Sequence, residues 1–383
     1  MPNDEQLIDE HRARSTADDV GPGPVPAETV LVGPSAAREA AAEPALDNGG
    51  WPAASSGAQL HVVTGKGGTG KTTVAGALAL ALAAGGRRVL LIEVEERQGI
   101  ARLFDLPPLP YAETRIAVAP DGGEVRALAV DVQAALLEYF QLFYNLGMAG
   151  RALKKMGAVE FATTLAPGLR DVLLTGKAKE TVTRTGSGGR RIYDAVVMDA
   201  PPTGRIVSFL NVTVAMSDLA QRGPIRSQAD GVATLLHSGQ TAVHLVSLLE
   251  EMPVTETLEA IGQLRAAGLP VASVIVNAVT DPLLPADDLD AAAAGNLDIT
   301  AVASGLAAAG MDIGDAAVAA LARQATEHAE RVSKEYQLEA QLADVGVPML
   351  TLPRLIDGVD LGGLYELSGM LADQGVSLDR KPT

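Results

Sequence analysis

The chain has 383 residues, of which 47% are apolar and 20% are charged, so it can bury a sizeable core and is not disordered throughout. Its 30 basic and 47 acidic side chains give a net charge of −17, which argues against nonspecific binding to nucleic acids. Because it has no cysteine, disulfides, cysteine nucleophiles and Cys-x-x-Cys zinc sites are excluded.

The first 57 residues differ in composition from the rest of the chain. They hold ten acidic and three basic side chains, are rich in Pro, Ala and Gly, and show no sustained apolar period. We predict that residues 1–57 form a disordered tail, which is either inert or regulatory. Because no secretory signal is visible, we expect a cytoplasmic protein that reaches a membrane only through a partner.

A different pattern extends over residues 58–378. Short, nearly continuous apolar runs alternate with longer stretches at helical spacing, as expected for parallel strands that are covered on both faces. The predicted fold is therefore an α/β fold with a doubly wound, mostly parallel sheet and a helical insertion. The predicted strands are Leu60–Val63, Val89–Ile92, Ala195–Met198, Val243–Val246, Val274–Val276 and Pro348–Leu352.

Two stretches are longer than a simple crossover between strands requires. Residues 131–190 allow two interpretations: a helix packed on the core, or a helical subdomain that presents an apolar face to a client. Residues 281–345 are rich in alanine and predict further helices. Residues 361–371 have helical periodicity without flanking basic residues, so we expect them to dock on the sheet. Residues 131–190 include four aromatic residues close together, Tyr139, Phe140, Phe143 and Tyr144.

Residues 65–73 carry the clearest functional signal. Their sequence has the form G-x-x-x-x-G-K-[ST], and it lies between a predicted strand and a predicted helix, as a phosphate-binding loop requires. Glycines let successive backbone N–H groups converge on phosphate oxygens, and the helix adds the positive end of its dipole. We predict that Lys71 reaches the β- and γ-phosphates of ATP and that the Thr72 hydroxyl holds Mg²⁺. The predicted nucleotide-binding residues of this loop are Gly65, Lys66, Gly67, Gly68, Thr69, Gly70, Lys71, Thr72 and Thr73.

A second functional block lies at residues 193–205, where an apolar run ends in Asp199. This arrangement is typical of a Walker B motif, whose aspartate supports the coordination shell of Mg²⁺. The sequence Asp-x-x-Pro-Thr-Gly from Asp199 resembles switch II of the arsenite-pump and guided-entry ATPases. Lys66, one residue after the first glycine, makes residues 65–73 similar to the deviant Walker A loop of the same class.

The resemblance covers about residues 59–378, and the most similar group is that of the actinobacterial anion-transporting ATPases. It implies a P-loop fold, ATP and Mg²⁺ as ligands, and a homodimer or paralogous heterodimer in which Lys66 reaches the partner's nucleotide. It further implies that Asn277 contacts adenine and that Pro353 and Arg354 belong to the adenine loop. The switch residues that it implies are Glu93, Glu95, Pro202, Thr203, Gly204 and Arg205.

Two positions depart from the family pattern. Glu95 stands where the family has the aspartate that orients the attacking water, so its carboxylate lies one methylene further out. We predict that Glu95 still positions water and that turnover is slow; the alternative is that Glu93 and Glu95 form a solvated strand end. Arg205 stands where the family usually has histidine, and it either contacts phosphate or pairs with an acidic side chain.

Together these residues predict a Mg²⁺-dependent ATPase with Lys66, Lys71 and Glu95 as catalytic residues. Its dimer would close on ATP to drive anion export through a transporter subunit, or to handle a hydrophobic membrane-protein client. The alternative is a nucleotide-gated binding module with negligible hydrolysis, forming one half of a paralogous heterodimer. The replacement at Glu95 motivates that alternative.

Overall fold

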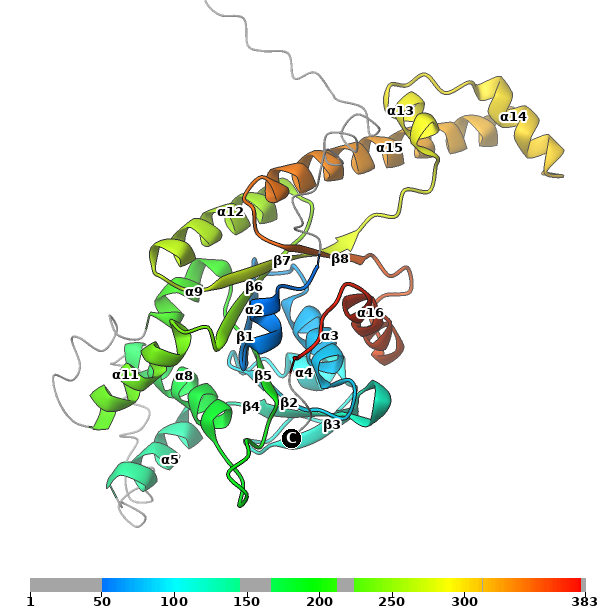
Figure 1. Cartoon of the computed structure of the whole chain (residues 1–383). Helices are drawn as coiled ribbons and strands as arrows, with labels where there is room; N and C mark the ends of the chain where they lie inside the picture. The colour runs from blue at the N-terminus through cyan, green and yellow to red at the C-terminus, as the bar shows by residue number, and fades with distance from the viewer. Residues whose placement is uncertain (1–49, 145–166, 212–223, 312, 380–383) are drawn as a thin grey trace, which may run out of the picture. The chain divides into compact units, whose positions relative to one another are not determined.

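The computed structural model describes residues 50–144, 167–211, 224–311 and 313–379. Their centre is an eight-stranded sheet in the order β3-β4-β2-β5-β1-β6-β7-β8 (Figure 1). All neighbouring strands pair in parallel except β3 and β4, which confirms the predicted α/β fold with a mostly parallel sheet. The strands are β1 Leu60–Gly65, β2 Arg88–Glu93, β3 Thr114–Val118, β4 Glu124–Ala129, β5 Ala195–Asp199, β6 Thr241–Ser247, β7 Val271–Val279 and β8 Met349–Pro353.

Strands β3 and β4 have no counterpart among the predicted strands. β3 lies at the edge of the sheet, and each of its five residues is exposed or half-buried. β4 alternates between buried and half-buried residues over its first half. Neither strand therefore has the continuous apolar run that marks a strand covered on both faces.

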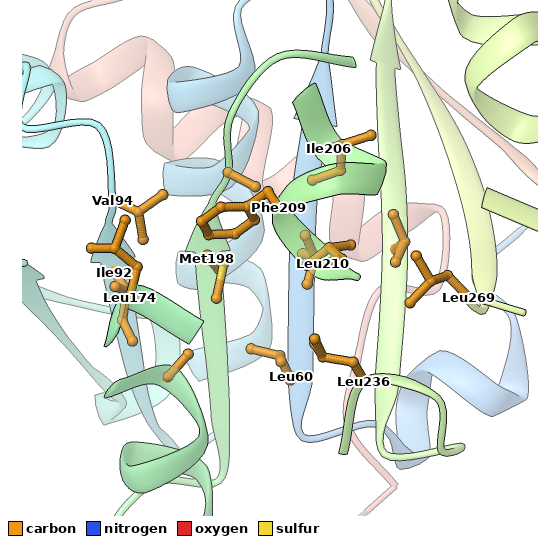
Figure 2. Packing of buried hydrophobic residues seen from close by; sticks show 14 of the residues in the cluster. Leu60, Ile92, Val94, Leu174, Met198, Ile206, Phe209, Leu210, Leu236 and Leu269 are labelled. Carbon is orange, nitrogen blue, oxygen red and sulfur yellow. The ribbon is translucent and has the colours of Figure 1, made fainter. Parts of the chain in front are cut away.

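Helices cover both faces of the sheet because successive side chains of each strand point to opposite sides. On one face, Val63, Val246 and Ile275 belong to a core shared with α3, α4 and α16. On the other face, Leu60 and Met198 pack with residues of α8, α9, α11 and α12, as Figure 2 shows for part of this core. These helices are α3 Lys71–Ala83, α4 Gly99–Leu103, α16 Leu361–Asp373, α8 Pro167–Thr183, α9 Thr203–Leu210, α11 Pro224–Leu236 and α12 Glu251–Ala266.

The remaining helices include those of the two long stretches. Residues 281–345 contain α13 (Ala286–Ala293), α14 (Ile299–Ala308) and α15 (Asp315–Ala343), and α15 contacts both of the others and α12. In the first stretch, α5 (Val132–Tyr144) contacts α8. The side chains of Tyr139, Phe140, Phe143 and Tyr144 lie outside the described part of the structure, so both interpretations of this stretch stay open. α16 buries Leu364, Leu367 and Leu371 against the sheet and α3, as expected for residues 361–371.

Packed structure begins before residue 58. The ring of Trp51 stacks on His61 and His244, with centroid distances of 5.6 and 5.1 Å, and Ser55 and Ser56 of α2 (Ala53–Gly57) are buried. Part of the predicted tail therefore packs on the domain, while residues 1–49 lie outside the described part. His61 and His244 are fully buried in neighbouring strands, and burial lowers the pKa of both, that of His61 to about 3.

Candidate functional site

The phosphate-binding loop joins the end of β1 to the start of α3, as the motif predicts. Gly70 has a φ of 86°, a left-handed conformation that favours glycine. A Cβ atom on Gly70 would also lie 2.3 Å from the side-chain nitrogen of Asn277. Asn277 packs this closely because its Nδ2 donates a hydrogen bond to the Thr69 carbonyl oxygen at 2.9 Å. In this structure Asn277 thus supports the loop, and its contact with adenine stays a prediction.

The middle of the loop leaves room for a bound polyphosphate. Gly67 and Gly68 are exposed, and a Cβ atom on either residue would meet no atom within 4 Å. Gly68, at φ 90°, and Gly70 are both in the left-handed region, so the loop turns sharply between β1 and α3. The backbone of residues 65–70 therefore forms an open concave cradle directly before the N-terminus of a 13-residue helix.

Lys71 points back over this cradle. Its Nζ donates a hydrogen bond to the Lys66 carbonyl oxygen at 3.2 Å. Burial lowers the pKa of Lys71, and the nearby charges of Asp199 and Glu95 oppose that effect. The ammonium group lies in a place where a phosphate would compensate its burial.

Thr72 and Asp199 meet where the Mg²⁺ site is predicted. The Thr72 hydroxyl donates a hydrogen bond to Asp199 Oδ2 at 2.7 Å, and Thr73 is the next residue of α3, half-buried. Burial at the end of β5 raises the pKa of Asp199 to about 6, against the hydrogen bond from Thr72 and the charge of Lys71. A buried carboxylate beside a hydroxyl is the oxygen donor set that suits Mg²⁺, so the residues present fit this ion.

The first switch segment, residues 93–98, contains three carboxylates, Glu93, Glu95 and Glu96, and the first two have different environments. Glu93 is buried and accepts hydrogen bonds from the backbone N–H groups of Gly99 and Ile100, so a solvated strand end is the wrong interpretation for this residue. Glu95 is mostly buried and lies 3.7 Å from the Arg97 guanidinium. Its charge acts on both Lys71 and Asp199.

The second switch segment, residues 199–205, is tied to the P-loop strand. The Thr64 hydroxyl donates a hydrogen bond to the Pro201 carbonyl oxygen at 2.7 Å, and Pro202 precedes the first turn of α9. In that turn Gly204 is exposed, and the Arg205 guanidinium lies 3.7 Å from Asp171 Oδ1. This ion pair favours the second interpretation of Arg205, in which it pairs with an acidic side chain.

Sequence reasoning missed Glu256 of α12. The Lys66 ammonium lies 2.5 Å from one carboxylate oxygen of Glu256, and the Thr203 hydroxyl donates a hydrogen bond to the other at 3.3 Å. One carboxylate thus holds the P-loop and switch II together within a single subunit. No local pattern announces this residue, because 190 positions separate it from Lys66.

The two residues of the predicted adenine loop lie at the end of β8. The Arg354 backbone N–H donates a hydrogen bond to the Val279 carbonyl oxygen at 2.9 Å, which joins this loop to the end of β7 near Asn277. Pro353 and Arg354 line a cavity of about 610 Å³. The structure thus brings the adenine-loop residues to the same edge of the sheet as the P-loop.

Comparison with known proteins settles the family. ATPase BagA of Mycobacterium tuberculosis is 59% identical to this chain over 327 residues, which are 85% of the chain and 96% of that protein. The sequence profile of the anion-transporting ATPases matches residues 58–229. The chain belongs to this family. The predicted resemblance is therefore confirmed, and the chain is an ATPase.

More distant relatives of this ATPase bear names that mention transport. An arsenical pump-driving ATPase of Escherichia coli is 25% identical over 248 residues, 60% of this chain and 41% of that protein. A putative arsenical pump-driving ATPase of Aquifex aeolicus is 27% identical over 150 residues, 38% of this chain and 46% of that protein. Both alignments cover less than half of the relative.

Two features are absent from the described part of the chain. No group of three or more His, Asp or Glu side chains in those residues could hold a metal ion. None of the helices in the described ranges is both long and apolar enough to cross a membrane.

Proposed function

We propose that this ATPase hydrolyses ATP with Mg²⁺ and that a dimer closes around the nucleotide during the cycle. The observation that carries the proposal is the open glycine cradle with Lys71 above it and the Thr72–Asp199 pair at its end. Thr72 and Asp199 would hold Mg²⁺, which supplies positive charge to the phosphate oxygens when it is bound. Lys71 adds a second positive charge, and backbone N–H groups of the loop add fixed dipoles.

Glu95 is our candidate for the residue that positions water. Of the three carboxylates of switch I, Glu93 is bound to two backbone N–H groups of α4, and the exposed Glu96 pairs with Arg170. Glu95 has neither of these contacts. Its charge acts on both Lys71 and Asp199, which supports a position near the expected terminal phosphate. We expect slow turnover, since the longer side chain places the carboxylate less accurately than aspartate would.

To contact nucleotide in a partner subunit, Lys66 must first leave Glu256. Both side chains of this pair are about one-third exposed, and partly exposed ion pairs of this kind are weak. A triphosphate offers several negative charges, so it can replace one carboxylate as the partner of Lys66. We propose that Lys66 then contacts nucleotide bound to the partner subunit.

The work that hydrolysis drives is proposed from the relatives and the fold together. The names of two relatives refer to driving an arsenical pump, so anion export through a transporter subunit is the first candidate. The handling of a hydrophobic membrane-protein client through residues 131–190 is the second. Purification under ATP of the Asp199→Asn variant, followed by identification of what stays bound, distinguishes a transporter subunit from a client.

Two substitutions and the removal of Mg²⁺ test the chemistry directly. We expect Lys71→Ala to reduce the rate of phosphate release by about 100-fold or more, because it removes a charge that acts on the phosphates. Glu95→Gln should reduce the rate with little change in ATP affinity. Chelation of Mg²⁺ should abolish turnover in the unmodified chain. Full turnover by Glu95→Gln would contradict the role given to Glu95, and full turnover without divalent cations would contradict the role of Thr72 and Asp199.

A further inference from the structure

We infer that the first turn of α8 positions both switch loops, with Arg170 acting on switch I and Asp171 acting on switch II. The Arg170 guanidinium lies 3.3 Å from Glu96 Oε1, and Asp171 Oδ1 lies 3.7 Å from the Arg205 guanidinium. Two successive residues of opposite charge thus each face a switch residue of the complementary charge. This inference rests on the roles proposed above for Glu95 and switch II.

The sheet places both switch loops within reach of this turn. β2 and β5 are neighbouring parallel strands, and Glu93 at the end of one pairs in register with Asp199 at the end of the other. The two loops therefore leave the same edge of the sheet side by side. The body of α8 is fixed beneath them by buried residues such as Leu174, which packs on the same core as Ile92 and Met198 (Figure 2).

Within the described residues, the Asp171 oxygen that faces Arg205 has an ion pair but no hydrogen bond. This oxygen is Oδ1, and the Asp171 side chain is only 15% exposed. Burial raises its pKa, while the charges of Arg205 and Arg170 oppose that effect. A carboxylate whose buried Oδ1 lacks a hydrogen bond from any described residue and faces the Arg205 guanidinium favours switch positions that keep Arg205 close.

Arg170 supports a strained part of switch I. Glu96 has a φ of 56°, a left-handed conformation that is uncommon for a residue with a side chain. The ion pair with Arg170 holds the Glu96 side chain outward, toward α8. Glu95 is the preceding residue, so this contact helps to set the direction of the carboxylate that is proposed to position water.

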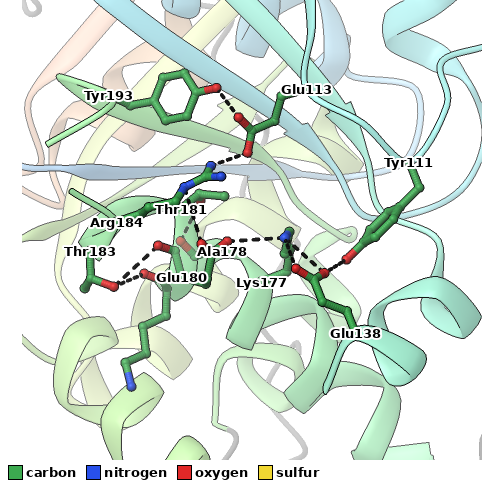
Figure 3. Close-up of polar contacts among 11 residues, drawn as sticks. Tyr111, Glu113, Glu138, Lys177, Ala178, Glu180, Thr181, Thr183, Arg184 and Tyr193 are labelled. Atoms are coloured by element: carbon green, nitrogen blue, oxygen red, sulfur yellow. Dashed lines mark hydrogen bonds and ion pairs between the residues drawn. The ribbon is translucent and has the colours of Figure 1, made fainter. Parts of the chain in front are cut away.

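The remainder of α8 is joined firmly to neighbouring elements, as Figure 3 shows. Lys177 pairs with Glu138 of α5 at 2.9 Å. Arg184, directly after the last residue of α8, donates a hydrogen bond to Glu113, which also accepts one from the Tyr193 hydroxyl at 2.5 Å. Because its first turn contacts the switch loops and Lys177 is held to Glu138, α8 links the switch positions to α5.

Charge exchange tests the inference in the full chain. We expect Arg205→Asp and Asp171→Arg each to lower the kcat for ATP hydrolysis by about 3- to 10-fold, with the KM for ATP changed less than about 2-fold. The double variant, in which the two charges are exchanged, should recover most of the kcat. Unchanged kcat in both single variants, or no recovery in the double variant, would overturn the inference.

A matched control comes from the other side of the sheet. Arg115 of the edge strand β3 lies 3.6 Å from Glu124, and its side chain is 56% exposed, as is that of Arg205. Arg115→Asp should leave kcat unchanged because this pair does not contact a switch loop. An equal loss of kcat in Arg115→Asp would assign the effect to surface charge in general and overturn the inference.

A second readout separates this inference from the proposed function. Amide hydrogen exchange of residues 93–98 and 199–205 is measured in the nucleotide-free chain, so it does not require hydrolysis or dimerisation. Exchange should increase in each single variant and return toward the original rate in the charge-exchanged variant. If the unmodified chain fails to respond to Mg²⁺ and ATP, the proposed function is wrong, yet this exchange pattern still decides whether α8 positions the switches.

Discussion

The two ends of α8 are held in different ways. At its first turn, two arginines that are 39% and 56% exposed form ion pairs of 3.3 and 3.7 Å with single carboxylate oxygens. Toward its C-terminus, Lys177 and Arg184 join two carboxylates that also accept hydrogen bonds from Tyr111 and Tyr193, both at 2.5 Å. The first set can rearrange at low cost, whereas the second forms a joint. The first turn is therefore the loose end of α8, whereas Lys177 and Arg184 hold its C-terminal half.

The joint is broken most severely by removing Glu113. Glu113→Ala leaves the Arg184 guanidinium and the Tyr193 hydroxyl without their shared acceptor. We expect the free energy of unfolding to fall by about 3 kcal/mol, since a partly buried charged donor and a hydroxyl both lose their partner. Urea denaturation measures this loss. A change below about 0.5 kcal/mol would show that the joint is no tighter than the first turn.

Acid is expected to destabilise the buried histidine pair at Trp51 at a higher pH than it destabilises the joint. His61 is buried and its pKa is lowered from 6.5 to about 3, so below pH 6.5 the unfolded chain binds more protons than the folded chain. This contribution to stability is present above pH 6.5 and is lost as the pH falls toward 3. We expect a loss of about 2 kcal/mol between pH 6 and pH 4, measured by urea denaturation at each pH.

The His61→Gln variant and the pKa of Glu113 provide two comparisons for this pH dependence. His61→Gln should reduce the slope of unfolding free energy against pH between 6 and 4, and an unchanged slope would contradict the assignment. At Glu113, hydrogen bonds from Tyr193 and Arg184 outweigh the effect of burial and hold the pKa below its ordinary value of 4.5. The stability that Glu113 contributes is therefore present above pH 4.5 and is lost only at lower pH.

A milder change in the joint is Tyr111→Phe. It removes the hydroxyl that donates to Glu138 at 2.5 Å, while Lys177 continues to pair with the same carboxylate. We expect the free energy of unfolding to fall by about 1 kcal/mol, the usual contribution of one hydrogen bond. Thermal unfolding of the two proteins side by side gives the difference. A loss as large as that of Glu113→Ala would place the centre of the joint at Tyr111 instead.

The smallest expected effect on stability is at the loose end. Arg205→Ala should change the free energy of unfolding by less than about 0.5 kcal/mol, because its ion pair is long and the guanidinium is largely exposed. Its kcat for ATP hydrolysis should nevertheless fall severalfold. Measuring both quantities on one preparation sharpens the contrast between the two ends. A stability loss above about 1 kcal/mol would make this contact part of the joint.

The sequence predicts those features of the molecule that depend on contiguous residues. The P-loop is a local motif, and the central strands are apolar runs, so both could be placed before the structure was known. β3 and β4 could not be predicted in this way, because an edge strand and its neighbour need not be apolar throughout. The contacts of Glu256 and Asp171 could not be predicted for a different reason. Each residue acts through a partner that is distant in the chain, and an acidic residue on a helix carries no local sign of that partner.

Mixing two inactive variants tests most directly whether Lys66 completes the nucleotide site of the partner subunit. Lys66→Ala lacks the lysine that is proposed to reach the partner's nucleotide, and Asp199→Asn lacks the carboxylate at its own Mg²⁺ site. In a mixed dimer, the site of the Lys66→Ala subunit keeps Asp199 and receives Lys66 from its partner. Equal amounts of the two variants should therefore recover about a quarter of the original ATP hydrolysis rate, since half of the dimers would hold one complete site. A mixture that stays as inactive as its components would contradict the account.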